Sequence, residues 1–137
     1  MMSQTFQRTA SPSFLRRVLQ ANGLFSALSG ATLVAAAKPL ASLFGLASPP
    51  IFIIVGALLA IYAAVLFGAA AREPVSRKLL LAAAILDSAW VIASAAGLLA
   101  GWFPITLAGK WAIVGIADVV AILAALEFYA LRRTRLT

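Results

Sequence analysis

The dominant pattern in the sequence is a series of long apolar runs without charged residues, separated by short polar links. A membrane-spanning helix needs about 20 mostly apolar residues, because each residue adds ~1.5 Å along the helix axis. Four runs reach this length. They predict an all-α membrane protein, an antiparallel bundle of four transmembrane helices at about residues 14–37, 51–71, 77–100 and 105–132.

The polar segments divide the chain further. Residues 1–13 lack periodicity and contain a proline, which is typical of a flexible tail. Residues 14–133 then form a single four-helix transmembrane domain, and residues 134–137 form a second short tail. The link at 38–50 is bounded by prolines and has an apolar middle, so we expect a short helix lying at the membrane surface there.

The composition supports this class and excludes several chemistries. Hydrophobic residues make up 64% of the chain and charged residues 11%, whereas soluble domains are roughly half apolar and about a quarter charged. Cysteine and histidine are absent, which excludes disulfides, thiol nucleophiles and histidine-ligated metals. No glycine-rich phosphate loop or nucleophile elbow occurs. We therefore expect no enzyme activity, no catalytic residues, no cofactor and no metal.

The net charge is +7, and the basic residues gather on one side of the predicted membrane. Nine of them flank the predicted cytoplasmic ends of the helices, against Lys38 and Lys110 on the other side. This asymmetry predicts a multi-pass protein with both termini in the cytoplasm. The same basic residues would attract anionic lipid headgroups. No motif for nucleic acid accompanies them, so a nucleic-acid partner is not expected.

Three of the four acidic residues, Asp87, Asp118 and Glu127, lie inside predicted spans. A charged side chain at the bilayer centre costs about 2.5–3.5 kcal/mol, so we expect all three to face the bundle interior. At ~1.5 Å per residue, Asn22 and Glu127 lie roughly 7 to 8 Å from the basic helix ends, Ser26 and Asp87 about 14 Å, and Asp118 about 20 Å. These depths predict two polar layers.

In the shallow layer, Glu127 is expected to meet Asn22 and an arginine that fixes the helix orientation. The candidate arginines are Arg16, Arg17 and Arg132. In the deeper layer, Asp87 is expected to meet Ser26 and, diagonally, Asp118. Asp118 and Glu127 are nine residues apart and point to opposite sides of their helix, so one cluster of all three acids is not expected.

Asp87 and Asp118 have no basic residue at their depth, so a neutral carboxyl group is the expected form. Three roles are compatible with this position. A neutral acid can donate a hydrogen bond that stabilises helix packing, it can carry a proton along a transport path, or it can contact a partner subunit.

Small and aromatic residues predict where the helices pack and where they meet the membrane surface. The third run repeats a small residue every four positions, at Ala89, Ala93, Gly97 and Gly101. This spacing lets another helix approach closely, so the stripe is expected in the bundle core or in an oligomer contact. Aromatic residues near the span ends are expected to act as interfacial anchors. They are Trp102, Trp111 and Tyr129.

The segments 15-LRRVLQANGLFSALSG-30, 86-LDSAWVIASAAGLLAGW-102 and 126-LEFYALRR-133 together resemble a group of small bacterial four-helix inner-membrane proteins. The resemblance implies the fold and a location in the bacterial inner membrane, but no particular activity. In that group an amide often occupies the positions of Asp87 and Asp118, which implies a hydrogen-bonding role. In size and four-helix plan the chain is also similar to small multidrug-resistance transporters, although it lacks their glutamate in the first helix.

These observations predict a non-enzymatic accessory or interaction subunit of the inner membrane that acts through helix packing. Its partner would be a second copy of the chain or another membrane protein. The alternative is a small proton-coupled transporter or binder of lipophilic molecules that uses Asp87 and Asp118.

Overall fold

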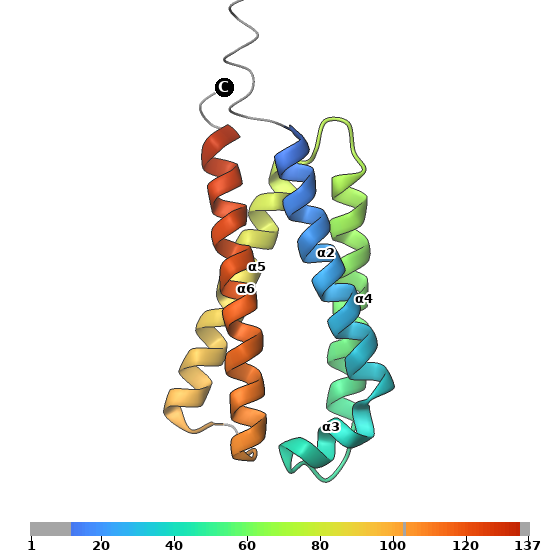
Figure 1. Cartoon of the computed structure of the whole chain (residues 1–137), viewed down its shortest axis with the longest axis vertical. Coiled ribbons are helices and arrows are strands. Elements are labelled where there is room, and N and C mark those ends of the chain that lie inside the picture. The colour runs from blue at the N-terminus through green and yellow to red at the C-terminus, as the bar shows by residue number, and fades with distance from the viewer. Residues whose placement is uncertain (1–11, 103, 135–137) are drawn as a thin grey trace, which may run out of the picture.

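The computed structural model describes residues 12–102 and 104–134, and these residues form five α-helices (Figure 1). The helices are α2 (Pro12–Ala35), α3 (Ala37–Phe44), α4 (Pro50–Ala70), α5 (Arg77–Ala100) and α6 (Leu107–Thr134). The prediction of an all-α bundle with four long helices is therefore confirmed. The first helix begins at Pro12 and the last one ends at Thr134; residues 1–11 and 135–137 of the predicted tails lie outside the described ranges.

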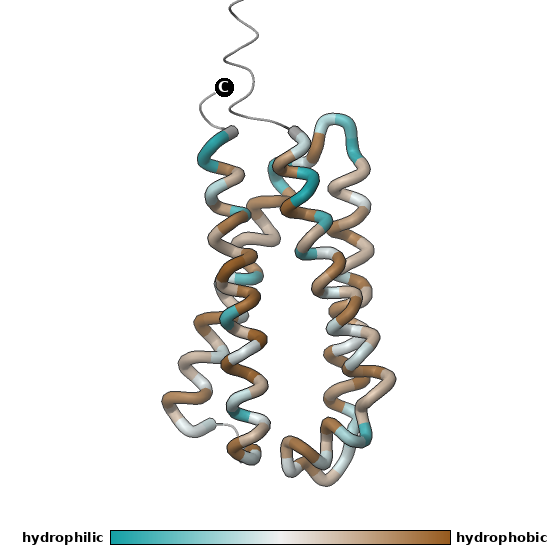
Figure 2. Tube along the Cα trace, viewed as in Figure 1, coloured by the Kyte–Doolittle hydropathy of each residue, from teal (hydrophilic) through white to brown (hydrophobic). Residues whose placement is uncertain are grey.

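The four long helices are each long and apolar enough to cross a membrane. The span in α4 is the most hydrophobic of the four, and the span in α2 is the least. Figure 2 shows that hydrophobic residues follow the helices along most of their length, while hydrophilic residues gather mainly at the start of α2, at the end of α6 and in the link between α4 and α5. The chain is thus a multi-pass integral membrane protein.

The long helices are arranged as two pairs. Helix α2 packs mainly along α4, and α5 packs mainly along α6, whereas contacts between the two pairs are fewer. Figure 1 shows the pairs converging where α2 begins and α6 ends, with α3 lying across the opposite end. We call the first of these the basic end, because α2 begins there, α6 ends there, and the chain turns there from α4 to α5, which starts with Arg77 and Lys78.

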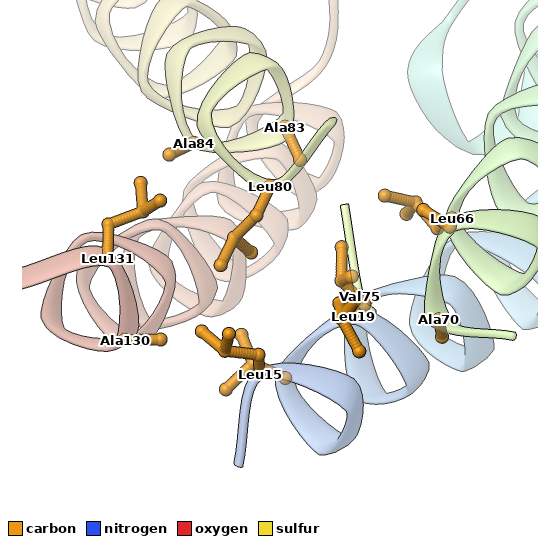
Figure 3. Packing of buried hydrophobic residues seen from close by; sticks show 12 residues of the cluster. Leu15, Leu19, Leu66, Ala70, Val75, Leu80, Ala83, Ala84, Ala130 and Leu131 are labelled. Carbon is orange, nitrogen blue, oxygen red and sulfur yellow. The ribbon is translucent and has the colours of Figure 1, made fainter. Parts of the chain in front are cut away.

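A hydrophobic cluster joins all four long helices at the basic end (Figure 3). Two leucines and a valine of α2 meet three leucines and five alanines of the other three long helices, together with a valine of the α4–α5 link. The cluster consists of Leu15, Val18, Leu19, Leu66, Ala69, Ala70, Val75, Leu80, Ala83, Ala84, Ala130 and Leu131. Two arginine side chains bond to backbone carbonyls of this cluster. Arg16 donates to the carbonyl of Ala70 at 2.7 Å, and Arg77 donates to the carbonyl of Leu131 at 2.9 Å.

The backbones of α2 and α4 approach each other closely at Gly30 and Gly56. A Cβ atom on Gly30 would lie 2.7 Å from the carbonyl oxygen of Gly56, and a Cβ on Gly56 would lie 2.7 Å from the carbonyl oxygen of Gly30. Any larger residue would force these backbones apart. This contact fixes how α2 is rotated about its axis, and hence which of its side chains face α5 and α6.

The short helix α3 connects the two pairs at the end opposite the basic end. It ends at Gly45, whose φ of 74° is a left-handed conformation that favours glycine. The backbone N–H of Thr106 donates to the carbonyl of Phe44 at 3.1 Å, and the Thr106 hydroxyl bonds to the carbonyl of Leu43. The Phe44 ring packs against Gly109, where a Cβ would lie 2.9 Å from it. A short helix is therefore present in the link, as predicted, and it is bonded to the start of α6.

The small-residue stripe of α5 does not form the bundle core, which corrects one of its two predicted locations. Gly97 is buried, but Ala89, Ala93 and Gly101 are exposed. The reason is that α5 buries the face carrying Asp87 instead. The aromatic residues predicted as anchors are exposed: Trp102 by 68%, Trp111 by 66% and Tyr129 by 50%.

Candidate functional site

A group of polar side chains is buried between the two helix pairs, next to the hydrophobic cluster of the basic end. We call Asn22, Ser26, Tyr62, Asp87 and Glu127 the polar cluster. Helix α2 contributes the first two residues, and α4, α5 and α6 contribute one each. Tyr62 is partly exposed and the other four are buried, with Glu127 completely inaccessible. All four long helices therefore contribute to one polar site.

Asn22 is the centre of this cluster. Its amide nitrogen donates to Asp87 Oδ2 at 2.6 Å and to Glu127 Oε1 at 3.3 Å. Its amide oxygen accepts a hydrogen bond from the Ser26 hydroxyl at 3.2 Å, one helical turn away. The Tyr62 hydroxyl donates to the other carboxyl oxygen of Asp87 at 3.0 Å. The α2–α4 pair thus supplies the donors and the α5–α6 pair supplies the carboxyl groups.

The hydrogen-bond donors of the cluster do not satisfy all of its acceptors. An asparagine amide has two N–H donors, and the serine and tyrosine hydroxyls have one each. All four are used, and Glu127 Oε2, although buried, receives no hydrogen bond from the described residues. The Asp87 and Glu127 carboxyl groups accept hydrogen bonds from the same amide nitrogen, so they lie close to each other. Two carboxyl groups hydrogen-bond to each other only if one of them carries a proton.

Glu127 meets Asn22, as expected, but it pairs with none of the candidate arginines. Arg16 instead forms an ion pair with Glu73 at 2.7 Å and also donates to the backbone carbonyls of Ala70, the last residue of α4, and of Arg72 in the link. No lysine or arginine among the described residues bonds to Glu127. The expectation of a Glu127–arginine pair is therefore wrong. The arginines lie at the helix ends, where backbone carbonyls and solvent are available to them.

The two polar layers expected from depth are a single cluster in the structure. Asn22 was expected to lie above Asp87, yet its amide bonds to both acids. Estimating depth along each helix separately assumes parallel axes, whereas α5 crosses behind α6 obliquely (Figure 1). Ser26 bonds to Asn22 and reaches Asp87 only through it.

Tyr62 is the member of the polar cluster that was not predicted from the sequence. It lies in α4, the most apolar span, and was not distinguished from the surrounding hydrophobic residues. One signal was available: a tyrosine in the middle of a span, away from the membrane surface, needs a hydrogen-bond partner for its hydroxyl. Asp87 is that partner.

Asp118 does not face the bundle interior, which is a second correction. It is exposed near the middle of α6 and forms no hydrogen bond or ion pair with a described residue. It lines a shallow groove between α5 and α6 together with Ala95, Ala117 and Ala121. Because Asp118 and Glu127 lie on opposite sides of α6, turning Glu127 toward Asn22 turns Asp118 outward.

The polar cluster has the chemistry of a proton site more than that of a metal site. Within residues 12–102 and 104–134, no three histidine, cysteine or acidic side chains come together to hold a metal ion. Two adjacent carboxyl groups, with hydroxyl and amide donors around them and no cation bonded to them, can hold a proton between them.

Comparison of the chain with protein-family models, with curated proteins and with solved structures finds no match.

Proposed function

We propose that the protein is a small proton-coupled transporter of lipophilic molecules, in which Asp87 and Glu127 share and release one proton. The observation that carries this proposal is that two buried carboxyl groups accept hydrogen bonds from one amide nitrogen, while no lysine or arginine among the described residues bonds to either. Glu127, and not Asp118 as expected from the sequence, is the second acid of this proton site. The function is non-enzymatic.

Glu127 Oε2 is the acceptor that has no donor among the described residues, and this supports a proton between the two carboxyl groups. A proton held between Glu127 and Asp87 removes the repulsion between two like charges. It also supplies the hydrogen bond that the amide and the hydroxyls of the cluster cannot supply. Releasing this proton would leave two negative charges in a low-dielectric site, where they repel each other strongly.

The position of the cluster supports coupling between the proton and helix movement. Its hydrogen bonds run from the α2–α4 pair to the α5–α6 pair, and these two pairs otherwise share few contacts outside the hydrophobic cluster and α3. Losing the proton would therefore weaken the contacts that hold the pairs together. A change in the separation of the pairs is the movement by which a lipophilic molecule would be exchanged.

Infrared spectroscopy tests the shared proton directly, because a protonated carboxyl group has a carbonyl band that an ionised one lacks. The chain has only four acidic residues, so Asp87→Asn and Glu127→Gln assign the bands. The Asp118→Asn background removes the signal of the remaining acid in a span. We expect one protonated band at neutral pH that disappears in either cluster variant. A spectrum in which both cluster acids are ionised would contradict the proposal.

Transport is tested in vesicles containing the purified protein, with an acidic interior and ethidium, a lipophilic cation, outside. We expect the wild type to accumulate ethidium as protons leave, and Glu127→Gln to reduce the rate by about tenfold or more, since an amide cannot release a proton. Asp118→Asn is the matched control and should keep the rate. Equal rates in both variants would count against proton coupling at the cluster.

The location proposed for this activity is the bacterial inner membrane, with both termini in the cytoplasm. Support comes from the sequence, in which nine basic residues flank the spans on one side of the membrane and two on the other. Anionic headgroups would bind there. A reporter that is active only in the periplasm, fused after Thr137, should remain inactive, and its activity would reverse the orientation.

A second candidate function is an accessory subunit that acts through helix packing. One observation favours it: Ala89, Ala93 and Asp118 are exposed on the α5–α6 pair. Small residues and an unbonded acid are typical of a surface that another helix covers. Co-purification in mild detergent tests this candidate, and recovery of the chain without any protein partner would count against it.

A further inference from the structure

The groove between α5 and α6 places an acidic side chain at the membrane-facing surface. Asp118 lies at this groove, whose volume is about 170 Å³ and whose other walls are small or aliphatic side chains. Lipid tails offer no hydrogen bonds, and no described residue of the chain bonds to this carboxyl group. An acid in this position requires a partner from outside the chain.

We propose that the groove is the contact between two copies of the chain, related by a two-fold axis along the membrane normal, with their Asp118 carboxyl groups hydrogen-bonded to each other. This self-association is separate from the proton site, because Asp118 and Glu127 lie on opposite sides of α6.

Membrane insertion makes a second copy the partner that fits this groove. All copies of one chain insert with the same orientation, so Asp118 of a second copy lies at the same depth. A two-fold contact brings identical residues together near its axis. A protonated carboxyl group has one donor and one acceptor, so two of them satisfy each other. The basic residues lie at the helix ends, so a second copy offers no cation at this depth.

The shape of the groove agrees with a close helix contact. Ala95 on α5 and Ala117 and Ala121 on α6 line it. Alanine side chains let neighbouring backbones approach closely in a membrane. A groove of about 170 Å³ accommodates a side chain from the facing helix.

Cross-linking tests the contact, and the chain is suited to it because it contains no cysteine. Ala121→Cys places a thiol in the groove beside Asp118, while Ile61→Cys places one on the exposed face of α4, also in the middle of its span. In vesicles treated with a mild oxidant, we expect at least tenfold more cross-linked dimer from Ala121→Cys than from Ile61→Cys. Equal or lower cross-linking at Ala121 would overturn the proposal.

A second pair of substitutions tests the hydrogen bond itself. In the Ala121→Cys background, Asp118→Asn keeps a donor and an acceptor, so dimer formation should stay within about twofold. Asp118→Leu removes both and should lower dimer formation about tenfold. Unchanged cross-linking in Asp118→Leu would overturn the role of the carboxyl pair.

The oligomeric state of the unmodified protein provides a measurement that does not depend on these variants. Fluorescently labelled chains in lipid bilayers should bleach in two steps, and the Asp118→Leu chains predominantly in one. Single-step bleaching of the wild type, or recovery of a lipid or another protein in the groove in place of a second copy, would overturn the proposal.

Discussion

Asp87 and Asp118 are the same residue type, both lie well inside a membrane span, and the structure treats them in opposite ways. Asp87 is buried among donors from α2 and α4 and receives hydrogen bonds at 2.6 and 3.0 Å. Asp118 is exposed beside a groove lined mainly by apolar side chains and receives none from the described residues. Hydrogen bonds within the described chain therefore offset the free-energy cost of placing an acid in the membrane for Asp87 but not for Asp118.

The difference between the two acids comes from their neighbours and not from their depth. Asp87 faces the helix pair that carries Asn22 and Tyr62, so two donors are available to it. The surroundings of Asp118 are alanine, valine and leucine side chains. A polar residue in a span thus indicates a contact, and the packing of the helices decides whether that contact lies within the chain or outside it.

The largest expected effect comes from replacing each acid by leucine. Asp87→Leu leaves the Asn22 amide and the Tyr62 hydroxyl without their acceptor, which should destabilise the fold by about 3 kcal/mol. Asp118→Leu removes no bond within the chain and should change stability by less than about 0.5 kcal/mol. Thermal unfolding in mild detergent measures both, at a protein concentration low enough to keep the chain monomeric. Equal losses in the two variants would remove the distinction between these sites.

A smaller effect is expected at the glycines near each acid. Gly30 lies one helical turn from Ser26, and a Cβ there would meet the carbonyl oxygen of Gly56 at 2.7 Å. Gly30→Ala should therefore separate α2 from α4 and cost about 2 kcal/mol. Gly115 lies one turn from Asp118, and a Cβ there would meet no other part of the described structure within 4 Å. Gly115→Ala is the matched control and should be neutral or stabilising by up to about 1 kcal/mol. A loss in the control as large as at Gly30 would contradict the packing described here.

The smallest effect is expected from removing one hydroxyl group. Tyr62→Phe deletes the hydrogen bond to Asp87 and should cost about 0.6 kcal/mol, the average for such bonds in membrane proteins. Tyr129→Phe deletes a hydrogen bond of the same length, 3.0 Å, that Arg133 donates at the exposed surface, and should cost less than about 0.3 kcal/mol. Unfolding measured side by side for the two variants compares their losses of stability. A larger loss at Tyr129 would mean that Tyr62 is not important to the cluster.

Several parts of the candidate site could be predicted from the sequence, and several could not. Asn22, Ser26, Asp87 and Glu127 are polar residues in apolar spans, so their type alone indicated buried contacts, and the structure brings all four together. Tyr62 was missed because an aromatic residue does not stand out from an apolar span. Asp118 was expected in the bundle interior because an acid is costly in the membrane, but the sequence does not show how α6 is rotated about its axis.

The rotation of each helix about its own axis was difficult to predict because the spans are apolar on nearly every side. In a soluble bundle, a polar face marks the side that turns to water. In a membrane that signal disappears, since lipid and core are equally apolar. The small-residue stripe of α5 was a false signal for the core for the same reason, as Ala89 and Ala93 are exposed.

The sequence by itself determined that the chain is an integral membrane protein with four long helices, and it determined most of their bounds. These properties depend on the length and hydropathy of local segments, which need no knowledge of tertiary contacts. Only the tertiary structure decided which acid is buried. The close contact of Gly30 with Gly56 and the oblique crossing of α5 and α6 set the rotation and tilt of each helix. That rotation brings Asp87 and Glu127 to one amide and leaves Asp118 facing outward.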